Sequence, residues 1–123
     1  MAGMKVLLVD DEQEFVTTLG ERLKLRGIDT DIAMGGEAAL EIIETSVPDA
    51  VVLDVMMPGL SGLDVLERIK ADRPDLPVIL LTGHGGTQEG IKGMRLGASD
   101  YLMKPLDIDE LIKKLHEAVR GAL

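Results

Sequence analysis

The segment VLLVDD, residues 6–11, decides the fold of this chain. Four apolar residues follow one another without a polar break, and the run stops at the acid pair Asp10-Asp11. A continuous apolar run is typical of a strand that is covered on both faces, whereas a half-exposed strand alternates apolar and polar residues. Strands covered on both faces belong mainly to parallel sheets, so this segment already favours an α/β fold.

Three further apolar runs have the same character and also stop at a polar residue. They are residues 50–53 before Asp54, residues 78–81 before Thr82, and residues 101–103 before Lys104. Residues 29–33 differ, because polar and apolar residues alternate over part of this stretch. This alternation predicts an edge strand with one face in water. The chain therefore contains five candidate strands.

Helical patterns separate the candidate strands. Apolar residues recur there with a period near 3.6, which places them on one side of a helix. The expected helices lie within residues 15–25, 38–43, 63–69, 87–96 and 111–119. Gly27 and Gly97 are expected to end the first and the fourth of them. The alternation of strands and helices predicts an α/β fold: a doubly wound, five-stranded parallel sheet with five helices on both faces.

The length and composition limit the possible functions. A chain of 123 residues can form one domain with a real hydrophobic core, and we expect it over residues 1–123, with residues 1–3 as a disordered or cloning-derived start. Its 13 basic and 22 acidic residues give a formal net charge of −9, which argues against a nucleic acid partner. The absence of cysteine excludes thiolate chemistry. The lack of a long apolar segment predicts a soluble, cytoplasmic protein without membrane contact.

Five polar residues stand at the expected carboxyl ends of four strands: Asp10, Asp11, Asp54, Thr82 and Lys104. Ligands of open parallel sheets bind in the crevice beyond these ends, so the five side chains are expected to converge there. Carboxylates that lie close together repel one another unless a cation neutralises them. Oxygen ligands without histidine or cysteine suit Mg²⁺, and a lysine with a hydroxyl group suits a phosphoryl group. A carboxylate of such a site can itself accept the phosphoryl group as an aspartyl phosphate.

Each of these residues alone has a plainer structural interpretation. Asp10 and Asp11 could cap the first helix, because aspartate is a favoured capping residue. Asp54 and Lys104 could be turn residues, and Thr82 could be an ordinary strand end. Only the combination of the motifs favours a functional site over these interpretations.

Taken together, the motifs resemble the receiver domain of bacterial two-component response regulators, similar to the single-domain chemotaxis type. The resemblance runs from about Lys5 to the C-terminus, which is almost the whole chain. Four motifs carry it, in order and at the family's spacing. They are Val9-Asp10-Asp11, Asp54-Val55-Met56-Met57-Pro58 with Gly62, Leu81-Thr82-Gly83, and Tyr101-Leu102-Met103-Lys104-Pro105.

The resemblance implies a role for each acidic residue of the site. Asp54 would be the phosphoacceptor. Asp11, the Asp54 carboxylate and the backbone carbonyl of Met56 would bind Mg²⁺ directly. Asp10 would act on the Mg²⁺ through water, and Lys104 would pair with the phosphoryl group.

The resemblance also implies roles for residues on the last two strands. Thr82 would hydrogen-bond the phosphoryl group, and Tyr101 would be the switch residue that turns inward. The Lys104–Pro105 peptide bond would be cis. The strand order would be 2-1-3-4-5, as in flavodoxin-like folds. Leu106 stands where the family often has phenylalanine, which bears on packing and partner docking rather than on the chemistry.

The implied function is a phosphorylation-dependent signalling switch. A sensor histidine kinase or a histidine phosphotransfer protein would donate the phosphoryl group to Asp54, and the chain would catalyse only its own phosphorylation and dephosphorylation. The modified chain would bind a downstream target protein, or a second copy as a homodimer, through its fourth helix, fifth strand and fifth helix. The glycines between residues 83 and 97 would ease this rearrangement. His84 and Met56 would tune dephosphorylation, and Phe15 is either a core residue or part of a face that docks the phosphotransfer partner.

Other protein classes share parts of this pattern. A small Mg²⁺-dependent phosphohydrolase of the haloacid dehalogenase type also uses a strand-end aspartate, but it needs a second acid where this chain has Met56. A flavodoxin-like electron carrier needs a phosphate-binding loop after the first strand, where Asp10-Asp11-Glu12 would repel a flavin phosphate. A receiver that works without phosphorylation normally lacks part of the site. The remaining alternative is the receiver fragment of a larger transcription regulator or hybrid kinase.

Overall fold

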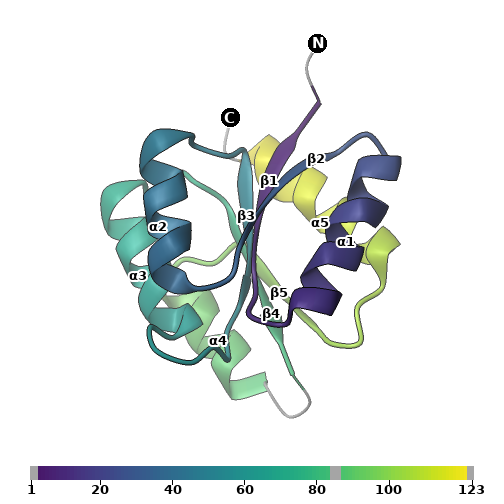
Figure 1. The fold of residues 1–123 in the computed structure, drawn as a ribbon. Helices are drawn as coiled ribbons and strands as arrows, with labels where there is room; N and C mark the ends of the chain where they lie inside the picture. The colour runs from purple at the N-terminus through teal and green to yellow at the C-terminus, as the bar shows by residue number, and fades with distance from the viewer. Residues whose placement is uncertain (1–2, 84–86, 122–123) are drawn as a thin grey trace.

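The computed structural model describes residues 3–83 and 87–121, and five strands alternate with five helices along this part of the chain. The strands are β1 (Lys5–Val9), β2 (Asp29–Ala33), β3 (Ala50–Asp54), β4 (Val78–Thr82) and β5 (Asp100–Met103). The helices are α1 (Gln13–Leu25), α2 (Gly36–Thr45), α3 (Gly62–Asp72), α4 (Thr87–Arg95) and α5 (Ile108–Gly121). The strands pair in parallel in the order β2-β1-β3-β4-β5 (Figure 1). This confirms the predicted doubly wound sheet and its strand order.

Helices cover both faces of the sheet. α1 and α5 lie on one face, and α2, α3 and α4 lie on the other (Figure 1). Successive residues of a strand point to opposite faces. Leu7 and Leu53 therefore pack in one core cluster with α2 and α3, whereas Leu8 and Val52 pack in a second cluster with α1 and α5. The core consists of two layers that the sheet separates.

The three central strands are buried on both faces, as their continuous apolar runs predict. All residues of β3 and β4 are buried, and so are residues 6–9 of β1. The edge position predicted for β2 is confirmed as well. β5 differs from expectation, because it forms the other edge of the sheet and only Leu102 is buried in it, while Met103 is exposed. An edge strand has a neighbour on one side only, so its apolar run does not show burial on both faces.

The helices are amphipathic, as their periodicity predicts. The buried apolar residues of the two longest helices are Val16, Leu19 and Leu23 in α1, and Ile108, Leu111 and Leu115 in α5. The outer side of α1 carries charged residues such as Glu21 and Lys24. Within residues 3–83 and 87–121, no helix has the length and apolar character that a membrane crossing requires.

α4 contacts the sheet through two glycines. Gly90 and Gly93 are buried, and a Cβ atom on Gly90 would fall 2.6–2.8 Å from three ring carbons of Tyr101. A Cβ atom on Gly93 would overlap the side chain of Leu80. The two glycines therefore allow α4 to approach β4 and β5 closely, which is a packing reason for residues that otherwise weaken a helix. Residues 84–86, which precede α4 in the sequence, lie outside the described residues.

α3 begins directly against the end of β3. Its first residue, Gly62, donates its N–H to the carbonyl oxygen of Val55 at 3.0 Å, and a Cβ atom on Gly62 would overlap the carbonyl oxygen of Asp54. Ser61 caps the helix, because its hydroxyl oxygen accepts a hydrogen bond from the N–H of Asp64 at 3.3 Å. These contacts fix the backbone at the end of β3, and therefore the position of Asp54.

Candidate functional site

The carboxyl ends of the strands bring acidic side chains together. Asp10 follows β1 and Asp54 ends β3, and these two strands are neighbours in the sheet. Both residues are buried, with exposed fractions of 1% and 4%. Their carboxylates and that of the exposed Glu12 offer oxygen atoms that all lie within 4.8 Å of one another. The result is a compact acidic site at the edge of the sheet where ligands of this fold class bind.

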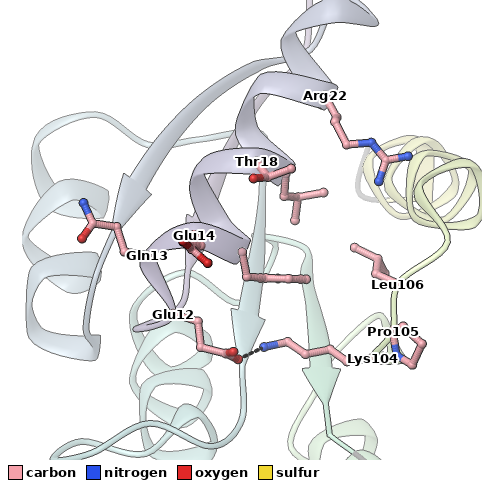
Figure 2. A pocket seen from close by; sticks show the side chains of 10 residues that line it. Glu12, Gln13, Glu14, Thr18, Arg22, Lys104, Pro105 and Leu106 are labelled. Carbon is pink, nitrogen blue, oxygen red and sulfur yellow. Dashed lines mark hydrogen bonds and ion pairs between the residues drawn. The ribbon is translucent and has the colours of Figure 1, made fainter.

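Lys104 supplies a positive charge to this site from the residue that follows β5. Its Nζ atom donates to Asp10 Oδ2 at 2.9 Å and to Glu12 Oε1 at 2.7 Å, and it lies 3.8 Å from Asp54 Oδ2. The ring centroid of Phe15 is 4.3 Å away. Figure 2 shows the Lys104 ammonium and the Glu12 carboxylate facing each other across the space between α1 and the segment after β5. One ammonium group thus offsets part of the negative charge of three carboxylates.

The pKa of Asp54 is raised from its ordinary value of 3.8 to about 6. Burial is the largest cause and the charge of Asp10 adds to it, whereas Lys104 and the N–H of Met56 act in the opposite direction. The Met56 N–H donates to Asp54 Oδ1 at 3.2 Å. The repulsion between carboxylates that the sequence predicts is therefore present, but loss of hydration contributes more to the pKa.

The neighbouring carboxylates stabilise the protonated form of Lys104. Burial is the largest single influence and would lower the pKa of Lys104. The hydrogen bonds to Glu12 and Asp10, together with the negative charges of Asp54 and Asp10, outweigh it, so the net pKa is raised. The side chain therefore remains an ammonium ion at neutral pH. A fixed ammonium with donors in several directions is able to pair with an additional anion, such as a phosphoryl group, that enters the site.

The structure brings together three of the five predicted strand-end residues, namely Asp10, Asp54 and Lys104. Asp11 is exposed and does not belong to the carboxylate group, in which Glu12 stands instead. Sequence reasoning missed Glu12, because an acid at the start of α1 has the ordinary role of complementing the helix dipole. Its position directly after the acid pair was the signal that could have found it. The role of Asp11 as a metal ligand stays a prediction.

Thr82 ends β4, beside the strand that carries Asp54, but its hydroxyl group is bonded to β5. The Oγ1 atom donates to the carbonyl oxygen of Leu102 at 3.4 Å, and the residue is buried. Tyr101 is half-buried, and its ring lies against Gly90 of α4. A contact between Thr82 and a phosphoryl group on Asp54 would therefore require the hydroxyl group to leave Leu102.

The other predicted residues lie around this centre. The Lys104–Pro105 peptide bond is cis. The side chain of Met56 is exposed, and Phe15 is half-buried against the core cluster of α1 and α5, so it is part core and part surface. His84 lies outside the described residues, and its tuning role stays a prediction.

A groove of about 750 Å³ opens beside the acidic site (Figure 2). It runs between α1 and the segment that follows β5. Ten residues line it: Glu12, Gln13, Glu14, Phe15, Thr18, Leu19, Arg22, Lys104, Pro105 and Leu106. Two of them, Glu12 and Lys104, also belong to the acidic site, so the groove leads directly to it.

The donor set fits a hard divalent cation such as Mg²⁺. The clustered side chains offer only carboxylate oxygens, which are the ligands that Mg²⁺ prefers in proteins. The raised pKa of Asp54 indicates that burial and Asp10 disfavour its negative charge, and a divalent cation would relieve this. Asp10 and Asp54 are the buried carboxylates that would face such an ion.

Comparison with protein families agrees with this geometry. The family described as the response regulator receiver domain matches residues 6–116 of the chain. The curated response regulators MprA of Mycolicibacterium vanbaalenii and of Mycobacterium leprae are each 38% identical to the chain over 117 residues. Each alignment covers 95% of this chain and 51% of the relative, so the chain spans about half the length of these curated relatives.

Solved receiver structures have the same architecture. The Francisella response regulator 1452 receiver domain has a TM-score of 0.90 and 35% identity, over 98% of this chain and 100% of that one. The receiver domain of NtrX from Brucella abortus has a TM-score of 0.90 and 34% identity, over 94% of this chain and 98% of that one. The match of sequence and fold extends over nearly the whole chain. The chain belongs to the family of response regulator receiver domains.

Proposed function

We propose that the chain is a signalling switch that accepts a phosphoryl group on Asp54. The observation that carries the proposal is the pairing of a buried carboxylate, whose pKa is raised, with the Lys104 ammonium 3.8 Å away. The Asp54 carboxylate is buried and therefore shielded from water, and it accepts a hydrogen bond from the N–H of Met56 that holds it in place. Asp54 also matches the phosphoacceptor position of the family motif, which supports the same assignment.

The donor in this proposal is a phosphohistidine on a sensor histidine kinase or a histidine phosphotransfer protein. A carboxylate oxygen of Asp54 forms a bond to phosphorus while the bond between phosphorus and the histidine nitrogen breaks. The partner's imidazole leaves and takes a proton from solvent. Hydrolysis by water later returns the Asp54 carboxylate and releases inorganic phosphate, so the chain acts only on its own acyl phosphate. The groove beside Lys104 offers the donor protein a surface that leads to Asp54.

Mg²⁺ is the proposed cofactor of both steps. Asp10, Asp11, the Asp54 carboxylate and the backbone carbonyl of Met56 are the groups that would hold it. When bound, Mg²⁺ supplies positive charge that offsets the repulsion between Asp54 and the incoming phosphoryl oxygens. Lys104 adds a second positive charge by pairing with a phosphoryl oxygen, because its Nζ atom is already within 4 Å of Asp54.

The output of the switch is proposed to run through Thr82 and Tyr101. The hydroxyl group of Thr82 leaves the carbonyl of Leu102 and donates to the phosphoryl group, and the Tyr101 ring then turns inward. This changes the surface of α4, β5 and α5. Apolar residues are already exposed there: Ile91 and Met94 on α4, and Met103 on β5. A downstream target protein or a second copy of the chain would bind this surface, and a nucleic acid partner is not expected for a segment with this net charge.

A phosphorylation assay tests the proposal directly. The chain is incubated with Mg²⁺ and acetyl phosphate, a small acyl phosphate donor, and its intact mass is measured. We expect one phosphoryl adduct that is lost on mild base treatment, as is typical of an acyl phosphate. Asp54→Ala is expected to remain unmodified. A wild-type chain that takes up no phosphoryl group would refute the assignment, and so would an unchanged adduct on Asp54→Ala.

The proposal holds equally for the receiver part of a longer regulator. The curated relatives are about twice as long as this chain. The activity of such a longer regulator would also depend on the half that this chain does not match. The chemistry at Asp54 depends only on residues within the receiver fold. The same assay therefore applies to the chain alone and to any longer protein that contains it.

A further inference from the structure

We propose that Glu12 is a positioning residue that holds Lys104 back from Asp54 and thereby slows phosphoryl transfer to the unmodified chain. This inference rests on the proposed function of Asp54 and Lys104. Glu12 takes no direct part in the bond changes. It acts through Lys104, whose ammonium group it binds.

The distances around the ammonium group define this role. Nζ of Lys104 lies 2.7 Å from Glu12 Oε1 and 2.9 Å from Asp10 Oδ2, but 3.8 Å from Asp54 Oδ2. Two of its three N–H groups are thus engaged by carboxylates that are not the acceptor. The shortest contact is made by Glu12, the most exposed of the three acids. Figure 2 shows this contact between Glu12 and Lys104 as a dashed line.

The residue before α1 and the first turn of α1 supply two of the groups around the ammonium. Glu12 directly precedes α1, and its N–H donates to Asp10 Oδ1 at 3.0 Å, so the base of its side chain is fixed to the site. Phe15 follows three residues later on the same side of the helix, and its ring centroid lies 4.3 Å from Nζ of Lys104. The ammonium is therefore held on the α1 side by a carboxylate and an aromatic face.

Phosphoryl transfer opposes this arrangement in two ways. The bond to Glu12 holds the Lys104 ammonium on the α1 side, 3.8 Å from Asp54 Oδ2, and it has to lengthen for the ammonium to come within hydrogen-bond distance of a phosphoryl oxygen on Asp54. The Glu12 carboxylate also lies within 4.8 Å of the Asp54 carboxylate, where its charge repels an incoming phosphoryl group. Both effects raise the activation barrier for phosphoryl transfer to Asp54. Both disappear when a neutral residue replaces Glu12.

Glu12→Gln tests the inference, because it removes the charge and keeps the length of the side chain. Glu14→Gln is the matched control: Glu14 lies on the same helix turn, is exposed, lines the same groove, and forms no ion pair among the described residues. The rate of modification by acetyl phosphate is measured for both variants and for the wild type, each at its own saturating Mg²⁺ concentration. We expect Glu12→Gln to react about two- to fivefold faster than wild type, as the loss of a part-exposed ion pair allows. Glu14→Gln is expected to react at the wild-type rate.

A second measurement follows Lys104 itself and does not depend on phosphorylation. Nitrogen-15 NMR of the lysine ammonium groups should give a Lys104 signal that exchanges slowly with water in the wild type and in Glu14→Gln, and faster in Glu12→Gln. Equal rates for the two variants, a slower Glu12→Gln, or an unchanged Lys104 signal would each refute the role of Glu12. A wild-type chain that is not modified at all would instead refute the proposed function, so the two failures can be told apart.

Discussion

The ring of Tyr101 on β5 lies directly against the backbone of Gly90 in α4, with no space for a side chain between them. A Cβ atom on Gly90 would fall 2.6 Å from the nearest ring carbon. The glycine and the tyrosine therefore set the distance between α4 and the edge strand. Any inward movement of Tyr101 has to begin from this contact.

Gly90→Ala is expected to destabilise the chain by about 1–2 kcal/mol. Overpacking against Tyr101 costs more than the roughly 1 kcal/mol that alanine gains over glycine in a helix. Gly121→Ala is the control, because a Cβ atom at Gly121 in α5 meets no atom of residues 3–83 and 87–121 within 4 Å, so alanine should be neutral or stabilising there. Urea denaturation gives the free energy of unfolding of both variants. A Gly90→Ala chain as stable as wild type would contradict the close contact.

Asp54→Asn is expected to stabilise the metal-free chain at neutral pH. The pKa of folded Asp54, about 6, lies above the ordinary value of 3.8, so the folded chain keeps a proton that the unfolded chain releases. The free energy of unfolding therefore falls as the pH rises from about 4 to about 6, and asparagine removes this loss. We expect a gain on the order of 2 kcal/mol at pH 7 in the presence of EDTA, shrinking toward zero at pH 4.

Denaturant titrations at several pH values check this prediction, with the exposed Glu67 as control. Glu67→Gln removes one negative charge from the surface of α3 and should change the free energy of unfolding little at any pH. A gain from Asp54→Asn that is the same at pH 4 and pH 7 would show that relief of the buried charge is not its cause.

Lys104→Met is expected to cost about 2 kcal/mol of stability without Mg²⁺. It leaves the buried Asp10 and Asp54 without their cation, and a buried charge that loses its partner is expensive. Lys114→Met is the matched control. Lys114 pairs with Asp100 at 2.7 Å, both side chains are partly exposed, and a solvent-accessible pair contributes about 0–1 kcal/mol. Equal losses for the two variants in urea denaturation would contradict a special role of Lys104.

Mg²⁺ is expected to raise the melting temperature, because the folded acidic site binds it and the unfolded chain does not. At millimolar Mg²⁺ we expect an increase of about 2–5 °C for a chain of this size. Asp10→Asn should abolish the increase, since Asp10 is one of the two buried carboxylates, whereas Glu67→Gln should retain it. Thermal unfolding followed by circular dichroism measures the shift. An increase that persists in Asp10→Asn would place Mg²⁺ binding elsewhere.

The sequence predicted the fold well because its decisive signals are local. The run Val6–Val9 and the acid pair after it report a strand covered on both faces and the position of its end. The same signal misled at Tyr101–Met103, where an equally apolar run forms an edge strand with Met103 exposed. Whether a strand has one neighbour or two is decided by the order of the whole sheet. The alternation in β2 indicated its edge position, but the continuous apolar run of β5 gave no such indication.

The site was predictable in its buried part and less so in its exposed part. Asp10, Asp54 and Lys104 come together because parallel strands end at the same edge of the sheet. Side-chain conformation decides between Asp11 and Glu12, since both stand in the loop before α1 and both are exposed. Which of the two side chains points into the site depends on contacts with residues far away in the sequence, here with Lys104. The spacing of the acids in the sequence does not predict it.

The approach of Gly62 to the backbone of Asp54 has a consequence for sequence variation. A side chain at position 62 would push the end of β3 out of place, although position 62 contributes no atom to the chemistry. In a saturation library selected for function, glycine should be retained at position 62 nearly as strictly as aspartate at position 54. The range of residues that position 62 accepts therefore reports how closely the backbone of α3 approaches the backbone of Asp54. Positions that make no contact with the ligand can in this way help to locate the site.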